Sequence, residues 1–303
     1  MLQASGGDFL AETSRAHGAP LSQTPTMRFP YHVVDVFTAT PFLGNPVAVI
    51  DCIGADGAPS DDEMQHIAHW TNLSETTFLL PPTDDSADYL VRIFTPSFEL
   101  PFAGHPTIGT AHVWRSLGNP PQRPDRIVQE CGIGLVELRS DDRLSFAAPP
   151  LQRSGALDPG LRTDVIDVLG IDPDTVVDTA WVANGPEWIG VQLATADEVL
   201  AVQPRTSDHL IGVVGAHAEG GPAQIEVRAF FPVDGATRED PVTGSLNASL
   251  AVWLTERGVL AAPYVARQGT AIGRAGMVHV DDVDHQLWVG GDAVTCVSGE
   301  LTI

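Results

Sequence analysis

Four polar residues of the sequence have types and neighbours suited to moving a proton: Glu75, His105, Asp240 and Ser245. Glu75 immediately precedes the apolar stretch TTFLL, where a carboxylate is poorly hydrated. Poor hydration raises the pKa of a carboxyl group toward the range in which it acts as a general base. Histidine is a common acid or base near neutral pH, and Asp240 and Ser245 could orient a substrate or relay a proton. The pattern predicts acid/base chemistry, while Asp240 taken alone also suits a structural role in a solvated turn.

Glu99 and Glu239 compete with Glu75 for the role of base. Each stands two residues before a proline, at the same position of two similar segments. A residue repeated in this way suits a structural hydrogen bond better than a single catalytic task. We therefore favour Glu75 as the proton carrier.

The two similar segments lie about 140 residues apart and share one pattern. VRIFTPSFELPFAGHPTIGTAHVW begins at Val91, and VRAFFPVDGATREDPVTGSLNASLAVW begins at Val227. Both read Val-Arg-x-Phe-x-Pro, then Glu-x-Pro-x-x-Gly, and then a run of small residues, which predicts a strand, a glycine turn and a helix. A repeat of this length exceeds any solenoid unit and indicates two related lobes. Clefts between lobes are where small ligands usually bind.

Both predicted helices begin with small residues, at Gly104 and at Gly244. Small side chains leave the first backbone N–H groups exposed, at the end of the helix where the dipole is positive. Pro106 suits a first helical turn, because its missing N–H would be unpaired there. We expect Gly104, Gly244, Pro106 and Thr243 to bind a carboxylate or phosphate between the lobes. The alternative is that the glycines only form turns and the small residues only pack tightly.

Local signals place the remaining elements. Capping boxes at Ser60–Glu63 and Thr195–Glu198 predict two helix starts, and Gly170 is expected at the end of a short helix. Strands are expected for YHVVDVF, TTFLL and YLVRIF in the first half and for IGVVGA and IEVRAFF in the second.

The domain limits follow from composition. Residues 1–26 are expected to form a weakly ordered tail. Residues 27–148 are expected to form an N-terminal lobe and residues 149–295 a C-terminal lobe, with Pro149-Pro150 at the boundary.

Composition excludes several classes of protein. The net charge of −23 argues against a nucleic-acid partner, because phosphate contacts need basic residues. The sequence contains no lysine, which excludes lysine Schiff bases and covalent pyridoxal phosphate. The beginning lacks the pattern of a secretory signal, no apolar run could span a bilayer, and three scattered cysteines suit a reducing compartment. We expect a cytoplasmic protein with no membrane partner.

Other catalytic and cofactor motifs are missing from the sequence. His66 and His69 lack a third residue at metal-ligand spacing, so no metal is expected. No GxGxxG joins a strand to a helix, and no GxSxG occurs, which argues against nicotinamide binding and an ordinary serine hydrolase.

The motifs DVFTATPFLGNPVAVI, NLSETTF, ELPFAGHPT, EDPVTGSLNASLA and RQGTAIGRAG resemble those of the PhzF family of phenazine-biosynthesis isomerases. The resemblance covers nearly the whole chain from Met27. It implies an α+β, diaminopimelate-epimerase-like fold, in which two pseudo-symmetric lobes each wrap a barrel-like sheet around a central helix. It further implies that the last strand, at 296–303, returns to the first lobe, and that the protein is a cofactor-independent homodimer.

Matched to the family motifs, Glu75 is the expected proton carrier, with His105, Asp240 and Ser245 assisting. The resemblance implies an isomerase that moves a proton and a double bond in a small carboxylate such as trans-2,3-dihydro-3-hydroxyanthranilate. Related epimerases use two cysteines, and neither repeated turn contains one. Two alternatives stay open: an amino- or hydroxy-acid epimerase using Glu75 and His105 as opposing groups, and a non-catalytic small-molecule binding protein.

Overall fold

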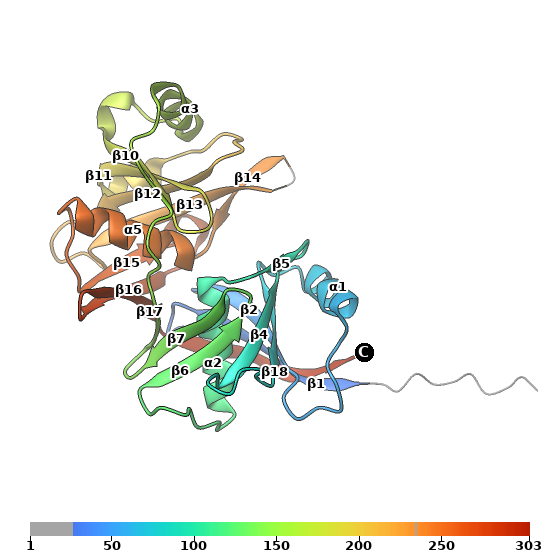
Figure 1. The fold of residues 1–303 in the computed structure, drawn as a ribbon. Coiled ribbons are helices and arrows are strands. Elements are labelled where there is room, and N and C mark those ends of the chain that lie inside the picture. Colours follow the sequence, from blue (N-terminus) through green and yellow to red (C-terminus); the bar gives the residue numbers. More distant parts are fainter. Residues whose placement is uncertain (1–26, 234) are drawn as a thin grey trace, which may run out of the picture.

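Strands are the most abundant regular element in the computed structural model, which describes residues 27–233 and 235–303 (Figure 1). The predicted tail, residues 1–26, lies outside the described residues. The first half contains β1 (Arg28–Val36), β2 (Asn45–Asp51), α1 (Asp61–Thr71), β3 (Thr76–Leu80), β4 (Tyr89–Phe94), β5 (Glu99–Leu100), α2 (Gly104–Ser116), β6 (Arg126–Cys131), β7 (Gly134–Ser140) and β8 (Leu144–Ala147). The second half contains β9 (Arg153–Gly155), α3 (Pro159–Leu169), β10 (Val176–Ala183), β11 (Trp188–Thr195), α4 (Ala196–Ala201), β12 (Leu210–Ala216), β13 (Ile225–Val233), β14 (Ala236–Asp240), α5 (Gly244–Glu256), β15 (Tyr264–Gln268), β16 (Gly276–Val283), β17 (Gln286–Gly291) and β18 (Ala293–Thr302).

The two halves repeat one order of strand pairing. In the first, β2 runs parallel to β3, β3 antiparallel to β4, and β4 pairs with both β5 and β6. In the second, β11 runs parallel to β12, β12 antiparallel to β13, and β13 pairs with both β14 and β15. The antiparallel series β6–β7–β8 corresponds to β15–β16–β17. The prediction of two related lobes is therefore confirmed at the level of strand connectivity.

The lobes are joined by strand pairing as well as by the chain. β17 pairs with β8, so the sheets of the two halves are continuous. β18 pairs with β1 along its length, from Ala293 opposite Val36 to Thr302 opposite Arg28. Figure 1 shows β18 returning beside β1, in the half of the molecule that contains α2.

A helix lies at the centre of each lobe. α2 contacts β1, β2, β3, β4, β8 and β18, whereas α5 contacts β10, β11, β16 and β17. Most residues of both helices are buried, including Ile108 and Val113 of α2 and Leu246 and Leu250 of α5. A helix that is apolar on nearly all sides is stable only inside a core. The sequence therefore requires strands to surround both helices.

The smaller helices begin and end where local signals predict. Ser60 and Glu63 form the reciprocal bonds of a capping box at the start of α1, and Thr195 and Glu198 do so at α4. Gly170 ends α3 in the left-handed conformation, with φ of 66°. These elements depend on nearby residues only, which is why the sequence predicts them well.

Candidate active site

The N-termini of the two central helices meet. A Cβ atom added to Gly244 would lie 3.2 Å from the Cα of Gly104, and one added to Gly104 would lie 2.7 Å from Cζ of Phe146. An added Cβ would clash with the Phe146 ring at Gly104 and would crowd the Gly104 backbone at Gly244, so both positions favour glycine. No described side chain caps either helix start. The predicted juxtaposition of the two glycine turns is confirmed, and it brings two positive helix ends to one place.

Glu75 and His105 face each other at this place. Glu75 lies just before β3, and His105 is the second residue of α2. Oε2 of Glu75 lies 3.3 Å from Nε2 of His105, with side-chain exposures of 16% and 7%. The two groups do not form a well-directed hydrogen bond, and within the described residues neither atom has another partner. Buried polar atoms are normally paired, so both atoms of this pair have unused hydrogen-bonding capacity.

Burial moves the pKa values of the two groups in opposite directions. Burial first, and then the charge of Asp240, raises the pKa of Glu75 to about 8. Burial lowers the pKa of His105 to about 3, partly offset by a hydrogen bond from the ring to the Pro46 carbonyl. Near neutral pH the proton therefore resides on Glu75, and the imidazole is neutral. A carboxyl with a pKa near the working pH can both accept and donate a proton.

Asp240, at the end of β14, lies on the opposite lobe. Nδ2 of Asn45 donates to its Oδ1 at 3.2 Å, and the Thr243 hydroxyl donates to its Oδ2 at 2.5 Å. Burial raises the pKa of Asp240 to about 6, against the lowering effect of these two hydrogen bonds. Above that pH Asp240 is a carboxylate, and its negative charge disfavours deprotonation of Glu75.

Thr243 forms hydrogen bonds with residues of its own lobe through its N–H, its hydroxyl and its carbonyl. Its N–H donates to Oε1 of Gln268 at 3.0 Å, and its hydroxyl accepts from Nε2 of Gln268 at 3.0 Å. Its carbonyl accepts from Nδ2 of Asn247 at 2.9 Å. Thr243 therefore orients Asp240 in this structure, and its contact with a substrate stays a prediction.

Ser245 is the second residue of α5, the position that corresponds to His105 in α2. Nε1 of Trp188 donates to its hydroxyl oxygen at 3.1 Å, and Nδ2 of Asn184 donates to its carbonyl at 3.0 Å. The Ser245 hydroxyl accepts one bond and retains its own hydrogen to donate. Sequence reasoning missed Trp188 and Asn184. The sequence offers one sign of their role: both have polar groups and they lie on either side of the Gly185-Pro186-Glu187 turn.

The repeated glutamates form the structural contacts predicted for them. Arg92 donates Nε and Nη2 to Glu99, both at 2.7 Å. Arg228 makes the equivalent bonds to Glu239 at 3.1 and 2.7 Å. Each bidentate pair joins the strand of the repeat to the short strand after its turn. The pairs explain why both copies of the pattern contain an arginine and a glutamate.

The three cysteines belong to neither central helix nor to the turns that precede them. Cys52 and Cys131 are buried near strand ends and Cys296 lies in β18, and burial raises the pKa of Cys52 to about 12. A thiol with such a pKa is a poor nucleophile and base near neutral pH. In the described ranges, no group of three or more His, Cys, Asp or Glu side chains could hold a metal ion. No described helix is long and apolar enough to cross a membrane.

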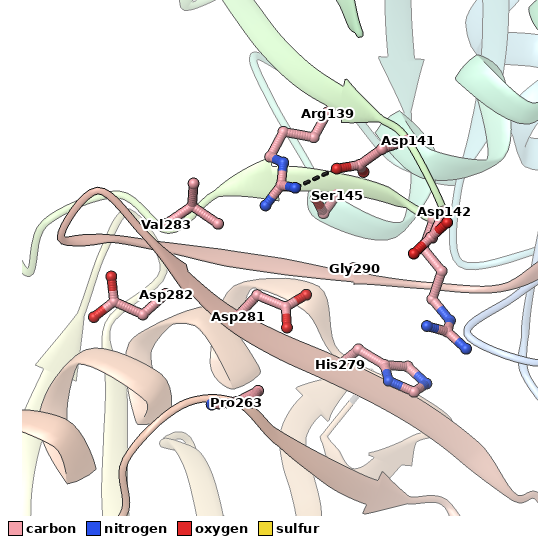
Figure 2. Close-up of a pocket in the computed structure, with 11 residues that line it drawn as sticks. Arg139, Asp141, Asp142, Ser145, Pro263, His279, Asp281, Asp282, Val283 and Gly290 are labelled. Atoms are coloured by element: carbon pink, nitrogen blue, oxygen red, sulfur yellow. Dashed lines mark hydrogen bonds and ion pairs between the residues drawn. The ribbon is translucent and has the colours of Figure 1, made fainter.

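A separate cavity of about 310 Å³ lies between the β7–β8 turn and β16 (Figure 2). Figure 2 shows Arg139 paired with Asp141 on one side, and Asp281 and His279 of β16 on the other. None of the predicted site residues lines this cavity. The residues predicted to move a proton therefore lie outside this cavity.

Comparison with known proteins identifies related chains. A family model described as phenazine biosynthesis-like protein, PhzC-PhzF, matches residues 34–299. Antisense-enhancing sequence 1 of Schizosaccharomyces pombe is 36% identical over 299 residues, covering 89% of this chain and 97% of that protein. The trans-2,3-dihydro-3-hydroxyanthranilate isomerase of Pseudomonas fluorescens is 35% identical over 257 residues, covering 82% and 88%.

A solved structure shows the same fold. The PhzF-family phenazine biosynthesis protein of Bacillus anthracis matches with a TM-score of 0.74 at 21% identity, covering 92% of this chain and all of that one. The prediction of an α+β, diaminopimelate-epimerase-like fold is confirmed.

Proposed function

Because the chain belongs to the PhzC-PhzF family and is an isomerase, we propose that it shifts a double bond in a small carboxylate by moving a proton through Glu75. The observation that carries this proposal is the buried contact between Glu75 and His105, whose facing atoms have no hydrogen-bond partner among the described residues. Glu75 has a pKa of about 8 there. Such a group can remove a proton as a carboxylate and return it as a carboxylic acid.

The substrate is expected to bind through its own carboxylate at the two helix starts. Among the described residues, these starts have no side-chain caps, and oriented backbone N–H groups bind anions without basic side chains. This arrangement explains how a chain with a net charge of −23 and no lysine could hold an anionic substrate. By analogy with the Pseudomonas fluorescens relative, trans-2,3-dihydro-3-hydroxyanthranilate is the first compound to test.

The proposed reaction balances with one carboxyl group. Glu75, as the carboxylate, takes the proton from C3, and the electrons of that C–H bond shift the ring double bonds toward C1. The same carboxyl exchanges its proton with the solvent and then protonates C1, and the enol formed becomes a ketone. His105 stays neutral and keeps Glu75 directed at the substrate, while Asp240 and the Ser245 hydroxyl hold the substrate's polar groups.

The geometry of the pair argues against an epimerase that uses Glu75 and His105 on opposite faces of a carbon. Opposing groups must each lie about 3 Å from the carbon between them. The two reacting atoms lie 3.3 Å apart, which leaves no room for a carbon. A double-bond shift needs one proton carrier and fits this distance.

The test is an NMR time course in D2O with the purified protein and trans-2,3-dihydro-3-hydroxyanthranilate. We expect the ring signals of the substrate to disappear and deuterium to enter at C1, with the reaction absent in Glu75→Gln. Glu63→Gln is a matched control, since it makes the same change at the exposed capping box of α1. Full activity of Glu75→Gln would refute the assigned role. Deuterium exchange at a stereocentre without movement of a double bond would favour an epimerase.

A further inference from the structure

We propose that Asn45 is a positioning residue that holds Asp240 of one lobe against the catalytic pair of the other. The inference rests on the proposed function, because it concerns the same site. It assigns a role to a residue that contacts neither Glu75 nor His105 through its side chain. Asn45 is the first residue of β2 and is completely buried.

The side chain of Asn45 bridges the two lobes. Its Nδ2 donates to Oδ1 of Asp240 at 3.2 Å and to the carbonyl of Val242 at 2.9 Å. Both partners are acceptors, so the amide can present only its NH₂ group to them. Oδ1 of Asn45 must therefore point the other way, and no described residue donates to it. The buried amide uses both its donors on the opposite lobe, one of them on the carboxylate itself.

The backbone next to Asn45 is tied to the catalytic pair. The carbonyl of Pro46 accepts the hydrogen bond from the His105 ring, and His105 faces Glu75. Two successive residues of β2 thus contact His105 in one lobe and Asp240 in the other. A displacement of this segment would change the separation between Asp240 and Glu75, and with it the effect of one charge on the other.

A second contact holds the same segment without touching Asp240. Nη1 of Arg274 donates to the carbonyls of Phe42 at 3.2 Å and Gly44 at 3.1 Å, and the N–H of Ala275 donates to the Leu43 carbonyl at 2.7 Å. Arg274→Ala would loosen the join between the lobes and keep the bond from Asn45 to Asp240. It is therefore the matched control for a purely structural role.

The contacts predict an effect on the titration of Asp240 and little effect on that of Glu75. Asp240 faces the charges of Glu239 and Glu75 and accepts from Asn45 and Thr243. Losing the Asn45 donor destabilises the carboxylate of Asp240, so its titration should move upward from about 6. A carboxyl with a midpoint near 7 is still mostly ionised at pH 8, so the Glu75 titration should stay close to about 8. The two midpoints should approach each other.

The experiment measures both titrations by NMR, in protein labelled with ¹³C at the side-chain carboxyls of aspartate and glutamate. Glu75→Gln and Asp240→Asn identify the two signals by their loss. In Asn45→Ala we expect the Asp240 midpoint to rise by about one pH unit, the size of a charged hydrogen bond, and the Glu75 midpoint to stay nearly unchanged. In Arg274→Ala we expect both midpoints to stay where they are in the wild type.

Equal shifts in Asn45→Ala and Arg274→Ala, or no shift in either, would overturn the proposal. If Asn45→Ala does not fold, Asn45→Asp keeps the shape and replaces the donor by a carboxylate, so the Asp240 midpoint should rise further. An unchanged midpoint there would also overturn it. The titration requires no substrate, so the role of Asn45 can be decided even if the wild type fails to turn over trans-2,3-dihydro-3-hydroxyanthranilate.

Discussion

The raised pKa of Glu75 predicts that kcat/KM increases with pH across neutrality. Removal of a proton requires the carboxylate, and burial with the charge of Asp240 raises the pKa of Glu75 to about 8. Asp240 itself has a pKa of about 6, so it remains ionised above pH 7 and adds no change there. The pH dependence between 7 and 9 should therefore report Glu75 alone.

The expected size of the effect follows from the ionised fraction. With a pKa of about 8, about one tenth of Glu75 is carboxylate at pH 7 and about nine tenths at pH 9. The value of kcat/KM, which reports the free enzyme, should rise about tenfold over this interval. With the ordinary pKa of 4.5, more than about 99% would be ionised at both values of pH, and the profile would be flat.

The assay is the initial rate of substrate loss at concentrations well below KM, at half-unit steps from pH 7 to pH 9. Thermal unfolding at each pH confirms that the protein stays folded, and Glu75→Gln supplies the background rate. A flat profile in an active wild type would refute the argument, because it would mean that Glu75 is already ionised at pH 7 or is not the base.

Three further predictions concern the same residues. Burial is the main cause of the raised pKa of Glu75, and the charge of Asp240 adds to it. Asp240→Asn removes that charge, so the midpoint of the pH profile should move to lower pH. The folded-state pKa of Glu75 is raised from 4.5 to about 8, so the stability of the wild type falls as the pH rises through that interval. Glu75→Gln lacks this titration. In urea unfolding the variant should be more stable than the wild type by a few kcal/mol at pH 8, and about equally stable near pH 4.5. Glu239→Ala leaves the buried Arg228, whose side chain is 6% exposed, without its carboxylate partner, and it should lower the free energy of unfolding in urea by about 3 to 5 kcal/mol. Glu99→Ala breaks the more exposed pair of the other lobe and should lower it by about 1 kcal/mol or less.

The local order of residues determined the main elements of the fold and the choice of Glu75 as the proton carrier. The repeated Glu-x-Pro-x-x-Gly pattern predicted two related lobes and two helix starts, because a strand, a glycine turn and a helix are specified by neighbouring residues. The glutamates repeated with it, Glu99 and Glu239, were expected to make structural bonds and do so with Arg92 and Arg228. Glu75 could be selected because it enters an apolar strand, where its carboxyl must lose water.

The tertiary structure decided how these residues act on one another. Asn45 and Asp240 are separated by 195 residues, and no local pattern links them. Trp188 and Asn184 contact Ser245 only because β11 and the turn before it pack beside α5. The separation of the pKa values, about 8 for Glu75 and about 3 for His105, depends on burial by both lobes together. Desolvation and charge are properties of the space around a group, and only the folded chain creates that space.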